Sequence, residues 1–296
     1  MVSPPSANGR PSEPGAQVNA METAVLAQIR AFKNPNETWL QNLADFVDYP
    51  LDVAGDFLFN NPIGDRVEPA VVRVMSVLNG AAASSVRHQA IFGRFREHGF
   101  SVDAVDDVAG LNIDGINETI GHLAAKYQSL GAMAGASASV LGVAGVTADI
   151  PALVTLALRA INEYATYFGF DSKQDDERWY VLMVLAAASS VTDAGRQRAL
   201  SEITRIGREM SAMQHADVID KRLTGNLVKR VAQALVVRLT KGRIARVVPG
   251  LGPVIGGGYN TLFLAEVCKT AYMLYAERWL MRKHGASVAA EVLASF

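Results

Sequence analysis

Five polar residues within otherwise apolar stretches are the positions at which this sequence is best suited to chemistry. They are Asp149, Arg159, Glu163, Asn260 and Glu266. Charged groups among apolar side chains have to be paired or solvated, so a convergence of these residues would form a polar ligand pocket. Asp149 can instead cap a helix, the role that we favour, and Arg159 and Glu163 are spaced to pair on one helix face. The sequence therefore predicts a pocket on the condition that these side chains converge.

Other motifs that would assign an activity are missing from the sequence. The five histidines are scattered, and no two lie four residues apart as the helical ligands of a zinc hydrolase do. Cys268 lies within an apolar stretch, which is typical of a buried structural thiol rather than a nucleophile. The glycines at 250–256 fit neither the dinucleotide-binding spacing nor a P-loop, because no Lys-Ser or Lys-Thr pair follows them. We expect no metal and no cofactor, and the sequence identifies no catalytic residue.

The charge of the chain is distributed unevenly, although its formal net charge is only −1. Residues 196–246 carry 12 basic and 4 acidic side chains, a balance of +8, against 16 basic and 25 acidic side chains in the remainder. Such a basic face suits anionic lipid headgroups or an acidic partner such as a membrane transporter. Alternatively, these residues form the solvated sides of two amphipathic helices and are neutralised by acids elsewhere. The candidate lipid-facing residues are Arg205, Arg208, Lys221, Arg222, Lys229, Arg230, Arg238, Lys241, Arg243 and Arg246.

Two uncharged, glycine-rich segments differ in composition from the rest of the chain, at 127–148 and 247–265. Small residues at four-residue intervals allow helix backbones to approach closely, in lipid or in a protein core. The second segment also contains two prolines, so we expect a helix break there, before a long last helix that starts at Asn260. The candidate hinge or close-packing residues are Gly131, Gly135, Gly142, Gly145, Gly250, Gly252, Gly256, Gly257 and Gly258.

Both segments approach the length of a membrane span, which needs roughly 20 predominantly apolar residues. Neither is favoured as a span, because small residues dilute the first and prolines interrupt the second. Peripheral, reversible attachment is the preferred interpretation, with an embedded helical hairpin as the alternative. The N-terminus has no apolar core behind a basic start, and the single cysteine cannot form an internal disulfide. We therefore expect a cytoplasmic protein, peripheral at the inner face of the membrane.

Helical periodicity predicts an all-α protein, a single multi-helix bundle with two glycine-rich apolar helical hairpins. Asn19 and Glu22 resemble a capping pair that opens a first helix, which runs to about residue 32. A second run is expected at 35–50, and a third at 68–98. Apolar residues then mark one helix face at 116–127.

The second half of the chain shows further helix boundaries. Asp149 and Pro151 resemble an N-cap and first turn, and Gly169 is placed to end that helix. Acids at 175–177 begin the next helix, and Gly195 separates it from two basic helices. The second of these carries an apolar stripe, and a last helix is expected from Asn260 to about Lys283. The stripe comprises Leu223, Leu227, Val231, Leu235 and Leu239.

Two of these stretches together resemble the EcsC family. The first is Ala148-Asp149-Ile150-Pro151-Ala152-Leu153, which follows the glycine-rich segment and precedes Tyr167-Phe168-Gly169-Phe170-Asp171. The second is Pro249-Gly250-Leu251-Gly252-Pro253-Val254-Ile255-Gly256-Gly257-Gly258-Tyr259-Asn260, before a helix ending in Arg278-Trp279-Leu280. Phe168 and Tyr259 depart from the family pattern, and the resemblance covers about residues 65–285. It implies a helical bacterial protein associated with a transporter system and with protein secretion or membrane-related regulation, and it supplies no catalytic residues.

Three functional hypotheses follow. The first is a non-enzymatic, membrane-associated accessory or regulatory protein that contacts anionic lipid or a transporter through its basic face. The second is a soluble carrier or sensor with an internal apolar cavity for a lipid-like molecule, and the third is a hydrolase that uses the embedded carboxylates. No nucleic-acid partner is expected, and the oligomeric state stays open. The expected organisation is a disordered tail at 1–19, N-terminal helices at 20–64 and an EcsC-like helical domain at 65–296.

Overall fold

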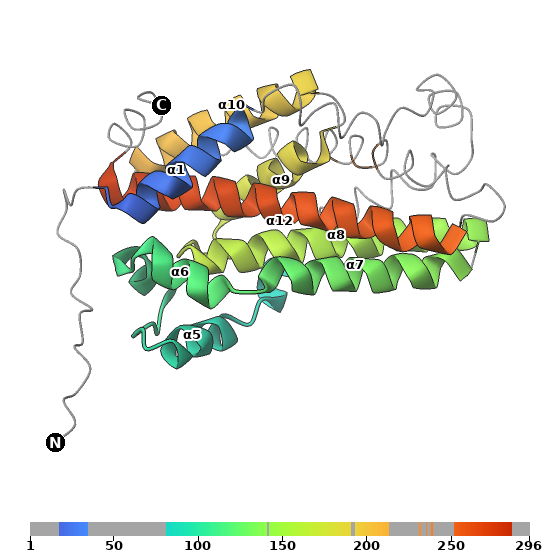
Figure 1. Ribbon diagram of the computed structural model, residues 1–296, viewed down its shortest axis with the longest axis horizontal. Coiled ribbons are helices and arrows are strands. Elements are labelled where there is room, and N and C mark those ends of the chain that lie inside the picture. The colour runs from blue at the N-terminus through green and yellow to red at the C-terminus, as the bar shows by residue number, and fades with distance from the viewer. Residues whose placement is uncertain are drawn as a thin grey trace.

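A central helix organises the fold of this protein. The structure is a computed structural model, and every regular element that it describes is a helix, which confirms the all-α class. The longest, α12 (Gly252–His284), crosses the middle of the molecule in Figure 1 and contacts most of the other helices. The described residues are 18–34, 81–140, 142–190, 193–212 and 252–285, with positions 231, 235 and 238.

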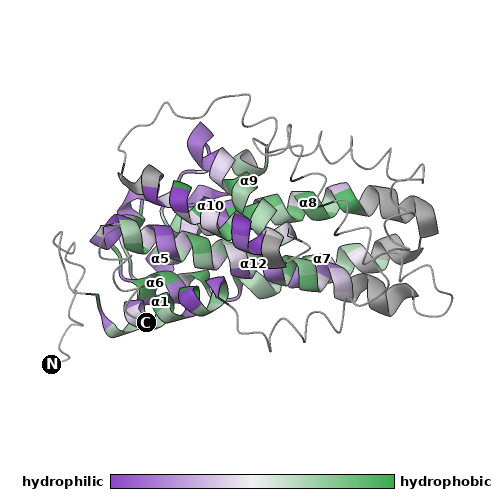
Figure 2. Ribbon diagram, turned by 90° about the horizontal axis from the view of Figure 1, so that it is seen from above, coloured by the Kyte–Doolittle hydropathy of each residue, from purple (hydrophilic) through white to green (hydrophobic). Residues whose placement is uncertain are grey.

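The remaining helices surround α12. They are α1 (Ala20–Lys33), α5 (His88–Glu97), η1 (Val105–Gly110), α6 (Ile113–Ile120), α7 (Leu123–Val140), α8 (Gly142–Tyr167), α9 (Asp175–Ser189) and α10 (Asp193–Ala212). Helices α7 and α8 form an antiparallel hairpin along α12, as expected for the first glycine-rich segment. Helices α1 and α10 lie above α12 in Figure 1, whereas α7 lies below it. Helix α8 is mostly hydrophobic, and α10 carries many hydrophilic residues (Figure 2).

The start of α1 shows how local sequence determines an element. Asn19 Oδ1 accepts a hydrogen bond from the Glu22 backbone N–H at 2.8 Å, and Glu22 Oε2 accepts one from the Asn19 N–H at 2.9 Å. This capping box satisfies backbone donors that a helix start otherwise leaves free, and it confirms the predicted start. The apolar face that follows is buried in the core, through Val25, Leu26, Ile29 and Phe32.

Two predicted helical runs are divided in the structure. The run expected at 68–98 is interrupted just before His88, where α5 begins. The Ser85 hydroxyl donates to the backbone carbonyl three residues earlier at 2.8 Å, a bond that competes with helix continuation. The face expected at 116–127 is shared between α6 and α7, because Gly121 adopts a φ of +48° that ends α6.

Three predicted boundaries are wrong because the helices begin earlier in the chain. Asp149 and Pro151 lie inside α8, so Asp149 is not its N-cap. Proline lacks a backbone donor, yet α8 continues through it because packing along α7 and α12 stabilises the helix. Helix α12 begins at Gly252 rather than Asn260, and Gly195 lies within α10. A helical glycine costs about 1 kcal/mol relative to alanine, which tertiary packing outweighs.

Gly131 lies where α7 and α12 approach each other. A Cβ at this position would be 3.0 Å from Asn260 O and 2.7 Å from Leu264 Cδ1. Because close-packed interiors hold carbon atoms further apart than this, a side chain does not fit without movement of α12. Gly258, in contrast, has no described atom within 4 Å of the position that a Cβ would take. The two glycine-rich segments therefore differ in how tightly these glycines pack.

None of the helices in the described ranges combines the length and apolar content that crossing a bilayer requires. Val231 and Leu235 of the predicted apolar stripe are helical and buried. Other predictions fall outside the described residues. These include residues 1–17 of the tail predicted at 1–19, the run at 35–50, Gly250, the stripe residues Leu223, Leu227 and Leu239, and the basic residues Lys221, Arg222, Lys229, Arg230, Lys241, Arg243 and Arg246.

Candidate functional site

The predicted pocket residues of α8 take part in an ion-paired cluster. Arg159 Nε lies 3.4 Å from Glu163 Oε1, as their four-residue spacing predicts. Lys126 of α7 reaches the same carboxylate, with its Nζ 2.8 Å from Oε2. The Glu163 side chain is nearly buried, whereas both cations are half-exposed. The cluster therefore ties α7 to α8, with both carboxylate oxygens already in contact with a cation.

The other predicted pocket residues belong to separate parts of the bundle. Glu266 pairs with Arg196 of α10. Asn260 is fully buried at the contact between α7 and α12. Glu163 and Glu266 thus serve different helix contacts, and the side chain of Asp149 lies outside the described residues. A pocket formed by all five residues stays a prediction.

Cys268 of α12 is buried in the core, where it faces Tyr164 of α8. Burial raises the pKa of its thiol to about 12, and the Tyr164 hydroxyl is among its neighbours. Because the reactive form of cysteine is the thiolate, such a group is almost entirely protonated and unreactive near neutral pH. The structure is therefore in line with the structural role that the sequence indicates for Cys268.

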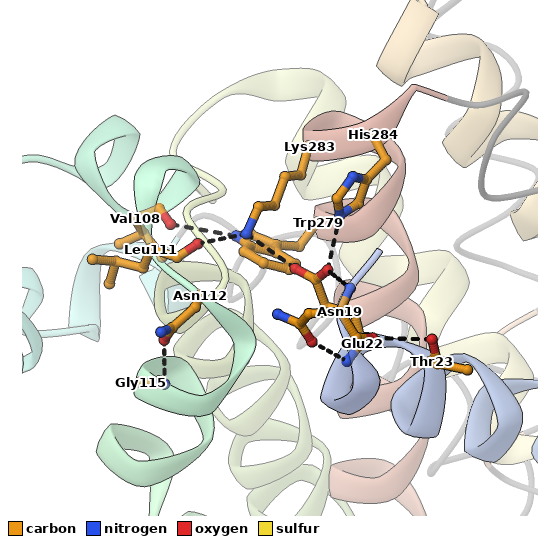
Figure 3. A network of polar contacts seen from close by, with 10 residues as sticks. All are labelled: Asn19, Glu22, Thr23, Val108, Leu111, Asn112, Gly115, Trp279, Lys283 and His284. Atoms are coloured by element: carbon orange, nitrogen blue, oxygen red, sulfur yellow. Dashed lines mark hydrogen bonds and ion pairs between the residues drawn. The ribbon is translucent and has the colours of Figure 1, made fainter. Parts of the chain in front are cut away.

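Both ends of α1 are tied to α12 by buried ion pairs. At the N-terminal end, Lys283 Nζ lies 3.0 Å from Glu22 Oε1, and His284 Nε2 lies 3.1 Å from Glu22 Oε2 (Figure 3). At the C-terminal end, Lys33 Nζ lies 2.5 Å from the Glu277 carboxylate. These contacts fix α1 against the bundle, so the side chains on its outer face are held at defined positions.

The pKa of Glu22 makes this anchor sensitive to acid. Burial acts to raise that pKa, but the Asn19 N–H, Lys283 and His284 outweigh burial, and the net pKa lies below its ordinary value of 4.5. A carboxyl group whose pKa is lowered by folding stabilises the fold above its ordinary pKa, and the contribution is lost as the pH falls through the lowered value.

We therefore expect Glu22→Gln to lower the free energy of unfolding at pH 7, and its deficit relative to the wild type to shrink below about pH 4.5. Urea unfolding of both proteins at a series of pH values measures this deficit. The change of this deficit with pH is compared between the two proteins only below pH 5, where histidine titration does not contribute. A deficit that stays constant down to pH 3 would contradict the assigned role of Glu22.

The outer faces of α1 and α10 enclose a cationic groove of about 590 Å³, which we call the α1–α10 groove. Helix α1 contributes its basic last turn, and α10 contributes successive residues of one helical face. No carboxylate belongs to the lining that the structure describes. The lining residues are Arg30, Lys33, Asn34, Gln197, Leu200, Ser201, Thr204, Arg205 and Arg208.

Hydrogen bonds join the two walls of the α1–α10 groove. Gln197 Nε2 donates to Lys33 O at 2.8 Å and so satisfies a carbonyl at the C-terminal end of α1. Lys33 Nζ donates to Thr204 Oγ1 at 2.7 Å as well as to Glu277 beneath the groove. These bonds hold α1 and α10 together in the absence of a ligand. The groove is therefore already formed before a ligand binds.

Two of the four cations in the groove have counterions. Lys33 pairs with the acid beneath it, and Arg205 Nη2 lies 2.7 Å from Glu202 Oε1. Arg30 and Arg208 pair with no carboxylate in the described part of the chain, and Arg30 Nη1 is buried without a hydrogen-bond partner there. Burial lowers the pKa of Lys33, and the nearby charge of Arg208 lowers it further. The Glu277 carboxylate acts in the opposite direction but does not outweigh them. The groove therefore holds an excess of positive charge suited to an anion.

Sequence reasoning identified half of this cationic set. Arg205 and Arg208 were among the predicted lipid-facing residues, whereas Arg30 and Lys33 were not. The sequence feature that could have identified Arg30 and Lys33 is their position, three residues apart, in the last turn of a well-capped amphipathic helix. Arg238, also predicted to face lipid, donates to Ser190 O at 3.1 Å and to the carbonyl of Ala188, and its contact with lipid stays a prediction.

A second cavity, of about 680 Å³, lies at the start of α5. It mixes apolar and basic side chains, and burial with the nearby charge of Lys173 lowers the pKa of His88. Its lining residues are Val86, Arg87, His88, Gln89, Ala90, Phe92, Ala104, Val105 and Lys173. Four of the predicted pocket residues have described side chains, and none of these four lines this cavity or the α1–α10 groove; they are Arg159, Glu163, Asn260 and Glu266.

The fold and the groove define an all-α protein with a basic, ligand-sized depression on its surface. The chain belongs to the EcsC protein family, which it matches over residues 61–280, and this confirms the resemblance seen in the sequence. Protein EcsC of Bacillus subtilis (strain 168) is 26% identical to it over 179 residues, which cover 60% of this chain and 70% of that protein.

A second protein of the same strain, the uncharacterized protein YdbA, is 23% identical over 183 residues. That match covers 61% of this chain and 64% of YdbA, so the chain spans somewhat less than two thirds of this relative. No solved structure shows a significant match.

Proposed function

We propose that this protein is a non-enzymatic accessory protein that attaches reversibly to an anionic lipid surface through the α1–α10 groove. The charge of the groove carries the proposal, because four cationic side chains line it and its described lining contains no acid. Arg205 and Arg208 are exposed at its outer edge, where a flat membrane surface can reach them. Anionic headgroups supply the negative charge that Arg30 and Arg208 lack among the described residues.

The expected strength of this contact explains why it would be reversible. Each basic residue near an anionic bilayer contributes about 1 kcal/mol, and the attraction fades within a Debye length of about 8 Å at physiological salt. Because two of the four cations already have counterions, the groove supports weak, salt-sensitive attachment rather than a permanent anchor. An acidic segment of a membrane transporter would meet the same charges and is the alternative partner.

Vesicle flotation tests this proposal with the full chain. We expect the protein to float with vesicles rich in phosphatidylglycerol at low salt, to stay behind with phosphatidylcholine vesicles, and to be released by added salt. Failure to float with the anionic vesicles at low salt would overturn lipid attachment and favour a protein partner. Flotation that salt does not weaken would assign attachment to apolar insertion instead of to the groove.

A further inference from the structure

We propose that the α1–α10 groove is a discrete site for one phosphomonoester group, with the guanidinium groups of Arg30 and Arg208 as its principal ligands. This inference rests on the proposed function, because the same groove meets the anion. It adds a defined stoichiometry and a chemical preference, a single dianionic phosphate in place of a diffuse negative surface.

The buried donor of Arg30 is the first observation behind this site. Its Nη1 is shielded from solvent and has no hydrogen-bond partner among the described residues, although the side chain lines the groove. Unsatisfied buried donors are costly, and folded proteins satisfy nearly all of them. Nε of Arg278 is also unpartnered, but that guanidinium lies 4.1 Å from the ring centres of Phe170 and Tyr180 in the core. Because other atoms of Arg30 line the groove, a rotation of its guanidinium would bring Nη1 to an acceptor there, whereas aromatic rings enclose Arg278 in the core.

The chemistry of the lining favours phosphate as this acceptor. A guanidinium presents parallel N–H donors that match two oxygens of a phosphate group. The exposed Ser201 on the α10 wall carries a hydroxyl that can donate a further bond. Lys33 is held by Thr204 and Glu277, so it fixes the wall of the groove and leaves the phosphate to the two guanidinium groups. A volume of about 590 Å³ also leaves room for the organic part of an ester.

Charge matching distinguishes a phosphomonoester from a phosphodiester. Arg30 and Arg208 together offer two positive charges that no described side chain neutralises. A phosphomonoester carries a charge of about −1.5 to −2 at pH 7, with its second pKa near 6, whereas a diester carries a single charge. The monoester therefore neutralises both guanidinium groups. Phosphatidic acid in a bilayer and a soluble ester such as glycerol 3-phosphate share this chemistry.

Isothermal titration calorimetry with glycerol 3-phosphate tests the site without a membrane. We expect saturable binding of one ligand per chain, which weakens as the pH falls below about 6 and the phosphate gains a proton. Arg30→Gln and Arg208→Gln should each weaken binding by about ten- to a hundredfold, since each removes a charge-assisted hydrogen bond. Arg198→Gln is the matched control, because Arg198 is exposed on α10 and does not line the groove. Unsaturable binding, or an equal loss in the control variant, would overturn the site.

Denaturant unfolding of the ligand-free proteins separates lost binding from lost folding. Arg30→Gln removes a charged donor that is unsatisfied in the folded chain, so its unfolding midpoint should equal or exceed that of the wild type. A clearly lower midpoint would make Arg30 a structural residue and overturn its role as a ligand.

Flotation on vesicles of equal surface charge then identifies the source of the phosphate. Stronger flotation with phosphatidic acid than with phosphatidylglycerol would support the site with a lipid headgroup as its ligand. Binding of glycerol 3-phosphate without flotation on either vesicle would support the site with a soluble ester and overturn lipid attachment. Equal flotation on both vesicles without glycerol 3-phosphate binding would overturn the site and leave the proposed function intact.

Discussion

Glu177→Gln is expected to lower the free energy of unfolding by about 3–5 kcal/mol, the cost of breaking a buried ion pair from one side. Arg278 Nη1 lies 2.8 Å from Glu177 Oε1 and 2.9 Å from Oε2, and the Tyr275 hydroxyl donates to Oε1 at 2.8 Å. Both charged side chains are 5% exposed. Removing the carboxylate charge leaves the guanidinium of Arg278 in the core without its counterion, with little access for water to solvate it.

The same helix turn provides a matched control. Asp175 pairs with Arg178 at 3.1 Å, but the Asp175 side chain is 93% exposed, so solvent screens this pair. Asp175→Asn should cost less than about 1 kcal/mol, although it changes the charge at the α9 N-terminus just as Glu177→Gln does. Urea unfolding of the three proteins measures the contrast. Similar losses in both variants would show that the helix terminus, rather than the buried pair, accounts for the effect.

Gly131→Val should destabilise the fold by about 3 kcal/mol, because a branched side chain would overpack the contact between α7 and α12. Even a single Cβ would lie 3.0 Å from the backbone oxygen of Asn260, which cannot rotate away as the end of a side chain can. The two helices would have to separate, and α12 would lose part of its packing along α7.

Gly258→Val is the control for this substitution. Gly258 also lies in α12, but it is exposed and has no described atom near the position of a Cβ. Valine is a somewhat better helix residue than glycine, so the free energy of unfolding should change by less than about 0.5 kcal/mol. Thermal or urea unfolding distinguishes the two variants. A loss at Gly131 no greater than at Gly258 would mean that α7 and α12 adjust freely.

Short-range signals in the sequence predicted several elements correctly. The Asn19 capping box is formed by residues three apart, so no tertiary information is needed to recognise it. Gly99 and Gly169, both placed at expected helix ends, have φ values of +83° and +77° that favour glycine. The acids at 175–177 also begin α9 as predicted.

Signals that depend on tertiary packing led to the errors. Pro151 and the triple glycine at 256–258 carry a local penalty against helix, and the sequence alone does not show the packing that outweighs it. The dependence on tertiary packing also explains why the sequence predicted only part of the cationic groove. Arg30 and Arg208 come from helices that are far apart in the sequence, α1 and α10, so only the folded bundle reveals that they line one groove.

The central claim, that the α1–α10 groove is what meets an anionic surface, is tested most directly by flotation of two double variants with equal net charge. Arg30→Gln/Arg208→Gln neutralises the groove, whereas Arg96→Gln/Arg198→Gln removes two exposed charges that do not line it. On phosphatidylglycerol vesicles at low salt, we expect the groove variant to lose most of its flotation and the control to retain it. Equal flotation of the two variants would contradict the claim, because attachment would then depend on net charge or on another face of the protein.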